Sequence, residues 1–221
     1  MKRRMSRKVK VGNIYIGGDS PVSVQSMLNK PASDIAGSVA QAIELEKAGC
    51  EIIRAAVPDM AAVELIAQLK KNLSVPVVAD IHFDYRLALA SLEAGVDKIR
   101  INPGNIGSMD RVRAVADACK LRQVPIRIGV NSGSLEKEIL AKYGSPCAEA
   151  LAESALNHVA LLEQCDFNDI IISIKSSNVN IMAQAYRLVA EKCDYPLHLG
   201  VTEAGGGRRS DSGPETRHLW I

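Results

Sequence analysis

The sequence is poor in aromatic residues, because phenylalanine, tryptophan and tyrosine together make up only 4% of its 221 residues. A hydrophobic core must therefore be built from isoleucine, valine, leucine and alanine, and such a core suits parallel β-strands packed under helices. Hydrophobic residues reach 47% and charged residues 24%, as is ordinary for a globular protein. A chain of this length can form one large domain or two small ones.

Long apolar runs are also lacking. None approaches the roughly 18 residues that a membrane span needs, and the N-terminus has no apolar middle region of a signal peptide. We therefore expect a cytoplasmic protein without a membrane partner. The net charge of +2 gives no reason to expect a nucleic-acid partner. The basic residues crowd the first ten positions, and such a run predicts a solvated arm; they are Lys2, Arg3, Arg4, Arg7, Lys8 and Lys10.

The cysteines show no pairing pattern. There are five of them, and no C-x-x-C occurs; they are Cys50, Cys119, Cys147, Cys165 and Cys193. An odd, scattered set fits reduced thiols rather than a disulfide framework. It also argues against a zinc or iron–sulfur site within this chain, since such sites normally take two ligands from one tight turn.

Short apolar runs alternate with stretches whose apolar residues recur at helical spacing. Seven strands are predicted, at Val22–Met27, Glu51–Val57, Val75–Ile81, Lys98–Asn102, Pro125–Asn131, Ile170–Lys175 and Leu197–Thr202. Helical stretches include Asp34–Ala48, Met60–Leu69 and Ala148–Cys165. This βα repeat predicts an α/β fold, a (β/α)8 TIM-type barrel that is incomplete because an eighth strand has no candidate.

The character of the sequence changes after Gly205. The last residues have neither helical nor strand periodicity. We therefore expect a barrel domain over residues 1–205 and a disordered tail over 206–221. A complete barrel typically needs about 250 residues, so the chain is short by roughly one βα unit and the closing strand.

Charged side chains interrupt the predicted strands near their carboxyl ends, where active sites of parallel barrels form. Four strands each bring one cation to the same rim, namely Arg54, Arg100, Arg127 and Lys175. A lone buried arginine is costly unless it is paired. The pattern therefore predicts a deep cationic pocket with Asp80 as internal partner. Arginine forks and a lysine suit the oxygens of a strongly anionic ligand such as a diphosphate.

Several of these residues also have a plain structural interpretation. Any single arginine can equally well face outward and pair with a helix carboxylate, and His82 or His198 can be a hydrogen-bonded core histidine. Asn102 and Asn131 can serve only to tie loop backbones near Gly and Pro. Glu203, at the exit of the last strand, can cap the next turn. The glycine-rich stretch from Asn102 to Gly107 is by itself a weak phosphate-binding signal.

Six blocks of sequence, in order, resemble bacterial 4-hydroxy-3-methylbut-2-en-1-yl diphosphate synthases over about residues 8 to 206. The blocks are Val24-Gln-Ser-Met, Val78-Ala-Asp-Ile-His-Phe-Asp-Tyr-Arg86, Arg100-Ile-Asn-Pro-Gly-Asn-Ile-Gly, Pro125-Ile-Arg-Ile-Gly-Val-Asn131, Gly133-Ser-Leu-Glu-Lys and His198-Leu-Gly-Val-Thr-Glu-Ala-Gly. The resemblance implies an iron–sulfur oxidoreductase of the non-mevalonate isoprenoid pathway. That enzyme opens the ring of 2-C-methyl-D-erythritol 2,4-cyclodiphosphate by a two-electron reduction to 4-hydroxy-3-methylbut-2-enyl diphosphate.

The resemblance also implies the roles of individual residues and partners. Arg54, Arg100, Arg127 and Lys175 would hold the diphosphate, with Asp80, His82, Asn102, Asn131 and His198 around it, and Glu203 would be the general acid. A [4Fe–4S] cluster fed by flavodoxin or ferredoxin would deliver the electrons, and the full-length enzyme is expected to be a homodimer. A carboxyl away from bulk water can have its pKa raised enough to donate a proton.

The sequence departs from the family after Gly206. The cluster-binding domain, which supplies three cysteines and one glutamate, has no counterpart here. We therefore expect a truncated or frameshifted product without turnover on its own. Two alternatives stay open: a pterin- or phosphate-binding barrel of the dihydropteroate synthase type, and a non-catalytic or misfolded remnant with exposed barrel edges.

Overall fold

The computed structural model describes residues 4–200 and 218–219. Its strands are β1 (Lys8–Val11), β2 (Ile14–Gly17), β3 (Val24–Met27), β4 (Ile52–Ala56), β5 (Val77–Asp80), β6 (Lys98–Ile101), β7 (Ile126–Asn131), β8 (Ile170–Lys175), β9 (Leu197–His198) and β10 (His218–Leu219). Its helices are α1 (Ile35–Lys47), α2 (Val63–Asn72), α3 (Tyr85–Glu93), α4 (Pro103–Ile106), α5 (Met109–Arg122), the 3₁₀ turn η1 (Ser132–Ser134), α6 (Lys137–Tyr143), α7 (Ala148–Glu163) and α8 (Val179–Lys192).

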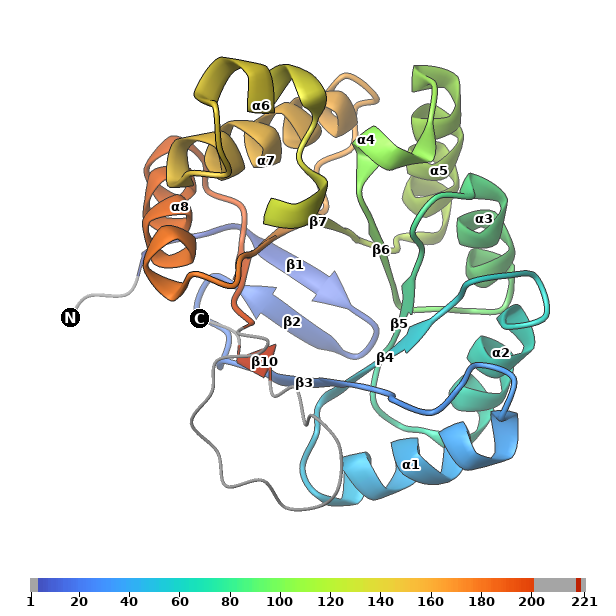
Figure 1. The fold of residues 1–221 in the computed structure, drawn as a ribbon. Helices are drawn as coiled ribbons and strands as arrows, with labels where there is room; N and C mark the ends of the chain where they lie inside the picture. The colour runs from blue at the N-terminus through green and yellow to red at the C-terminus, as the bar shows by residue number, and fades with distance from the viewer. Residues whose placement is uncertain (1–3, 201–217, 220–221) are drawn as a thin grey trace.

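A curled parallel sheet forms the centre of the fold, with helices around its outer face (Figure 1). Strands β3 to β9 are neighbours in chain order, and β10 pairs antiparallel with the outer edge of β3. The seven predicted parallel strands and the incomplete TIM-type barrel are thus confirmed. Within the described residues β9 does not pair with β3, so the ring of strands stays open.

Alternation along the strands separates two environments. On β4 and β7, Ile53 and Ile128 belong to the large core cluster, which also includes buried residues of the surrounding helices, such as Leu65 on α2 and Leu151 on α7. Residues of the other parity point into the barrel. Burial of the outward isoleucines, valines and alanines against helices is the main source of stability, at roughly 25 cal/mol per Å² of apolar surface.

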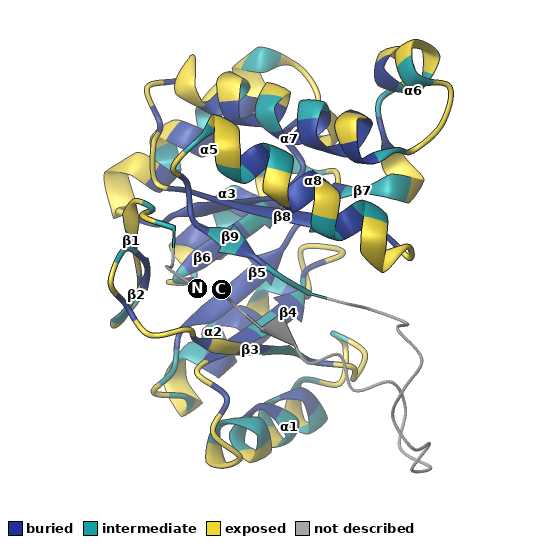
Figure 2. Ribbon diagram, turned by 90° about the vertical axis from the view of Figure 1, so that its left-hand side faces the viewer, coloured by how far each residue is buried: buried dark blue, intermediate teal, exposed yellow. Residues whose placement is uncertain are grey.

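The hairpin β1–β2 closes the amino-terminal end of the barrel, and Figure 2 shows it to one side of the sheet. Its Val9, Val11 and Ile16 form a second buried cluster with inward-facing residues of the strands, including Ile52 and Val78. This hairpin is not among the strands predicted from the sequence. We expected its first strand to be part of a basic arm, whereas the valines of that strand are buried and its lysines exposed.

The expected N-terminal arm is not free at Arg4 and Arg7, because both hydrogen-bond to the segment between α8 and β9. Arg7 is nevertheless exposed, as expected, and Arg4 is half-buried. Of the expected disordered tail, residues 206–221, only the two residues of β10 are described, and the rest lies outside the described residues. Among the residues that are described, no helix is long and apolar enough to cross a bilayer.

Candidate functional site

A pocket of about 270 Å³ lies at the carboxyl ends of the parallel strands. Its polar lining comes from five strands, the loop after β5 and helix α8: Arg54, His82, Arg100, Arg127, Asn131, Ser173, Lys175, Tyr186 and His198. All four predicted cations are therefore brought together. None of the described residues that line the pocket is acidic, so the pocket itself carries an excess of positive charge.

Asp80 lies just beneath this lining and joins three of the predicted residues. The pairing of β4, β5 and β6 places Arg54, Asp80 and Arg100 on inward positions of adjacent strands. Arg54 donates to Oδ2 of Asp80 through Nη2 and, at 3.1 Å, through Nε, while Nη1 of Arg100 lies 3.1 Å from Oδ1. The Nε2 atom of His82 lies 3.3 Å from Oδ2. Asp80 is thus the internal partner that the sequence predicted.

The electrostatics of this cluster follow from its contacts. Burial alone would raise the pKa of Asp80, but the hydrogen bond with His82 and the charges of Arg54 and Arg100 outweigh it and hold that pKa well below its usual range. Burial lowers the pKa of Arg100, and the nearby Asp80 opposes that change. One carboxylate is thus shared between two guanidinium groups.

Arg127 is the most deeply buried of the predicted cations, with 3% of its surface exposed. Its Nη1 donates to the hydroxyl of Ser173 at 2.6 Å, and that hydroxyl donates to the carbonyl of Ile128 at 2.9 Å. Within the described part of the chain, the Nε and Nη2 atoms of Arg127 have no hydrogen-bond partner. Burial, and then the charges of Arg54 and Arg100, lower the pKa of Arg127 well below its usual value. The described residues therefore give this guanidinium no counter-ion of its own.

Gly129 makes room for the guanidinium group of Arg100. A Cβ atom at Gly129 would lie 2.3 Å from Nε of Arg100, closer than any real contact allows. The Nη2 atom of Arg100 donates to the carbonyl of Gly129 at 3.3 Å. A glycine on β7 thus lets the Arg100 side chain lie across that strand toward Arg127.

Tyr186 on α8 is a pocket residue that the sequence pattern did not reveal. Its hydroxyl accepts from the backbone N–H of Ile174 at 2.8 Å and lies within hydrogen-bonding distance of the carbonyls of Ile174 and His198. One hydroxyl proton serves only one carbonyl at a time. Tyr186 therefore ties β8 to β9 beside the pocket. Helical periodicity marks it only as a core position, so the sequence carries no signal for this contact.

The remaining predicted residues differ in placement. His198 is buried and lines the pocket, and Lys175 is exposed at its mouth. Asn131 lines the pocket, but its Oδ1 accepts from Gly133 N at 3.1 Å and caps η1. Asn102 caps α4 through Gly104 N and does not contribute to the lining. Glu203 lies outside the described residues, so its role stays a prediction.

Beneath the pocket lies a buried amine that was not among the predicted site residues. Lys98 sits two residues before Arg100 on β6, with the same inward parity, and is 0% exposed. Its Nζ donates to Oε1 of the buried Gln25 on β3 at 3.2 Å. Burial, followed by the charges of Arg127 and Arg54, lowers the pKa of Lys98 well below its usual value. The spacing of Lys98 from Arg100 was the signal that would have found it.

The described residues do not fit an iron–sulfur cluster. No group of three or more His, Cys, Asp or Glu side chains among them is arranged to hold a metal ion. The five cysteines are free and distributed over different elements, and Cys50, Cys119 and Cys165 are buried. The described part of the chain therefore offers no ligand set for such a cluster.

The sequence matches a family of known TIM-barrel proteins, in agreement with the barrel fold described above. The model of the GcpE TIM-barrel domain matches residues 6–211. The chain is 60% identical over 205 residues to the 4-hydroxy-3-methylbut-2-en-1-yl diphosphate synthase (flavodoxin) of Clostridium perfringens, covering 93% of this chain and 59% of that protein. The protein of the same name from Pseudomonas putida is 56% identical over 208 residues, covering 94% and 56%. The chain thus spans somewhat over half the length of these curated relatives.

Solved structures share the fold at low sequence identity. A 3-dehydroquinate dehydratase of Geobacillus kaustophilus superposes with a TM-score of 0.67 at 16% identity, covering 92% of this chain and 82% of that one. The dihydropteroate synthase of Yersinia pestis gives 0.62 at 14%, covering 88% and 75%. These likenesses concern the fold alone. The strand order, the pocket at the strand ends and the family match over nearly the whole length lead to one conclusion: this chain belongs to the GcpE TIM-barrel family.

Proposed function

We propose that the pocket binds the phosphate groups of 2-C-methyl-D-erythritol 2,4-cyclodiphosphate. In this proposal the chain is the substrate-binding barrel for reductive ring opening to 4-hydroxy-3-methylbut-2-enyl diphosphate, a step of isoprenoid biosynthesis. Family membership and the name carried by its relatives support this reaction. The observation that carries the proposal concerns Arg127, a buried cation. Two of its donor atoms, Nε and Nη2, have no acceptor among the described residues.

The charge balance around Arg127 supports an anionic ligand. Arg54 and Arg100 donate to Asp80, whereas Arg127 donates to the hydroxyl of Ser173. The hydrogen bonds of these three arginines therefore include one carboxylate among the described residues. Leaving a buried charge without a counter-ion costs several kcal/mol, so a ligand that supplies negative charge is strongly favoured. Two phosphate groups provide enough oxygens to accept from several guanidinium forks at once.

Each side chain then has a stated task. The three arginines donate to phosphate oxygens, and Asp80 holds Arg54 and Arg100 in place before the ligand arrives. Lys175 adds a point charge at the mouth, and His82, Asn131 and His198 orient the ligand from the lining. Asn102 does not contact the ligand in this proposal; its side chain caps α4 by accepting from the backbone N–H of Gly104. Glu203 remains our candidate for the proton donor to the departing oxygen.

The reduction needs two electrons from outside the described residues. The names of the relatives specify flavodoxin, so we propose flavodoxin rather than ferredoxin as the donor. Because the described residues do not fit the cluster that the resemblance implies, we expect the purified chain to bind substrate without turning it over. Product formation in an anaerobic assay with a chemical reductant would contradict this expectation.

Calorimetric titration of the chain with the cyclodiphosphate tests the binding proposal. Arg127→Met keeps most of the side-chain volume but removes the charge, and should weaken binding about 10- to 100-fold, the worth of one or two charge-assisted hydrogen bonds. Arg100→Ala should weaken it to a similar extent. The matched control is Arg122→Ala, which removes an exposed arginine at the end of α5 and should leave affinity unchanged.

Salt provides a second reading of the same experiment. Binding by a cationic pocket should weaken as ionic strength rises, because mobile ions screen the attraction. A folded chain that shows no saturable binding of the cyclodiphosphate would overturn the proposal. So would tight binding of a pterin in its place, which would favour a function of the dihydropteroate synthase type.

A further inference from the structure

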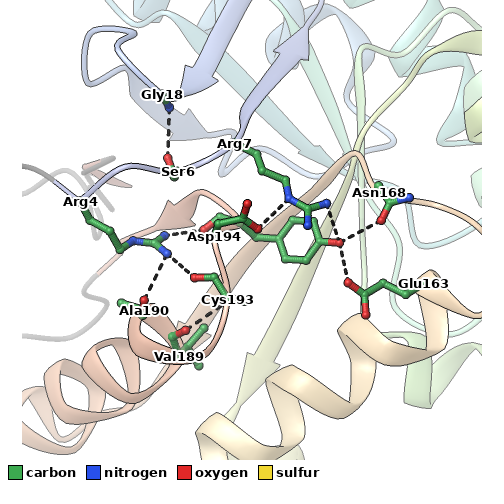
Figure 3. Close-up of polar contacts among 11 residues, drawn as sticks. Arg4, Ser6, Arg7, Gly18, Glu163, Asn168, Val189, Ala190, Cys193 and Asp194 are labelled. Carbon is green, nitrogen blue, oxygen red and sulfur yellow. Dashed lines mark hydrogen bonds and ion pairs between the residues drawn. The ribbon is translucent and has the colours of Figure 1, made fainter.

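The first described residues, 4–7, lie along the segment that joins α8 to β9, and we call them the N-terminal clasp. Figure 3 shows Arg4 reaching the end of α8. Its Nη1 donates to the carbonyl of Cys193 at 2.5 Å, and its Nη2 donates to the carbonyl of Tyr195 at 2.5 Å. A third carbonyl, that of Ala190, lies 3.4 Å from Nη1. One guanidinium thus satisfies backbone acceptors where the helix ends and the chain turns toward β9.

Arg7 adds contacts on the same segment. Its backbone N–H donates to the carbonyl of Asp194 at 2.7 Å, and its Nε donates to the Asp194 carboxylate at 2.7 Å. Its guanidinium carbon lies 4.3 Å from the ring centre of Tyr195. Tyr195 is buried, and its hydroxyl donates at 2.8 Å to Glu163, the last residue of α7. The clasp therefore contacts residues 194 and 195, and this segment is hydrogen-bonded to α7 through Tyr195.

The other side of the clasp is fastened to the hairpin. The hydroxyl of Ser6 accepts from the backbone N–H of Gly18 at 3.1 Å. A Cβ atom at Gly17 would lie 2.1 Å from the carbonyl oxygen of Arg7, and Gly17 has a φ of +81°. Only glycine therefore fits where the clasp passes the end of β2. The glycine at this turn thus allows the backbone of Arg7 to lie directly against β2.

The strand that follows the clasped segment has few other constraints. β9 contains two residues and pairs with β8 through Ile172↔Leu197 and Ser173↔His198. Within the described residues no strand pairs with its outer edge. Its position beside the pocket therefore depends on β8, on the hydroxyl of Tyr186 and on the segment that the clasp holds.

We propose that Arg4 is a positioning residue: through the backbone of residues 193–195 it sets the position of β9 and so places His198 in the anion pocket beside Ser173. This inference rests on the proposed function, because it gives the clasp a role in binding the anionic ligand. Arg4 itself does not line the pocket. It acts through the chain that leads from Tyr195 to His198.

The test compares Arg4→Met with Lys10→Met, a matched control that removes an exposed cation on the neighbouring β1. The first reading is the NMR chemical shifts of the His198 ring in the chain without ligand, assigned with His198→Ala. Arg4→Met should move these signals, and Lys10→Met should not. The second reading is affinity for pyrophosphate, which should fall about 3- to 10-fold in Arg4→Met, the scale of effects transmitted through packed segments.

A double-mutant cycle separates positioning from general loss of stability. If Arg4 acts through His198, Arg4→Met should not weaken pyrophosphate binding further in a His198→Ala background. Arg4→Lys keeps one donor group and should give an intermediate shift of the His198 signals; it decides the question if Arg4→Met does not fold. Unmoved His198 signals in a folded Arg4 variant would overturn the inference. A wild-type chain that binds neither pyrophosphate nor the cyclodiphosphate would overturn the proposed function, while the His198 signals still report on the clasp.

Discussion

The two ends of the barrel interior are made by the same strands but differ in chemistry. On β4, Ile52 faces the hairpin, and Arg54, two residues later, faces the pocket. On β5, Val78 packs in the same apolar cluster, and Asp80 lies under the pocket. The lower level combines this apolar cluster with the buried Gln25 and Lys98, the register partners of Ile52 and Val78. The upper level holds the arginines, and among the described residues Arg100 and Arg127 have donor atoms without a hydrogen-bond partner. In the proposed function, stability and binding thus depend on successive inward positions of the same strands.

Of the changes considered, Asp80→Asn should lower the free energy of unfolding most, because it leaves Arg54 and Arg100 without their shared carboxylate. Removing one partner of a buried ion pair costs about 3–5 kcal/mol of the free energy of unfolding. Pyrophosphate should restore part of that loss by supplying negative charge. Urea unfolding with and without pyrophosphate measures both quantities. A variant that gains no more from pyrophosphate than the wild type would contradict the assignment.

Ile52→Ala breaks the apolar layer instead. It should lower the free energy of unfolding by about 2–4 kcal/mol, as is usual when a buried isoleucine is truncated. Affinity for pyrophosphate, measured well below the melting temperature, should stay unchanged. Ile53→Ala, on the outer face of the same strand, is the matched control and should cost a similar amount. A loss of affinity in Ile52→Ala would show that the two layers are coupled.

The smallest effect concerns Glu136, the residue directly before α6. Glu136 contacts the buried His158 at 2.6 Å and accepts from Ser154 at 2.8 Å. Burial would raise the pKa of Glu136, but the hydrogen bonds from His158 and Ser154 outweigh it and lower that pKa to about 2. Its stabilising contribution is therefore complete above the ordinary value of 4.5 and is lost as the pH falls from there toward 2.

Glu136→Gln should remove this part of the acid sensitivity. Since the glutamate is 28% exposed, solvent screening limits the expected difference to about 1 kcal/mol. Urea unfolding of both proteins between pH 2.5 and 6 makes the comparison, and Asp80 contributes equally to both curves. Wild-type and variant curves that run parallel over this range would refute the prediction.

Prediction from the sequence succeeded where one regular periodicity decided the outcome. Alternation along strands placed Arg54, Asp80 and Arg100 at inward positions, and parallel strands bring such positions to one rim. It left two interpretations open where short-range contacts compete. Asn102 was expected near the ligand, but a helix begins directly after it, and its side chain caps that helix. Whether an asparagine at a strand end caps or binds depends on backbone angles that composition does not reveal.

Contacts between distant segments were the other source of error. The valines of β1 alternate with lysines, so the sequence was interpreted as a basic arm and not as a strand. The structure shows that Val9 and Val11 are buried against inward-facing residues of the sheet. Arg4 was expected to be a solvated cation, yet its acceptors are carbonyls about 190 residues away along the chain. Backbone carbonyls are present at every position, so no residue pattern identifies which of them a guanidinium will meet.

The amino-acid sequence by itself determined the number of parallel strands, the side on which each residue lies and the excess of positive charge at the strand ends. These properties follow from local periodicity and from charge, both of which can be read along the chain. Only the tertiary structure decided that Arg127 meets no counter-ion among the described residues, that Tyr186 ties β8 to β9, and that the N-terminal clasp holds the segment leading to His198. Such contacts depend on which surfaces meet once the sheet has curled, a property of the packed whole.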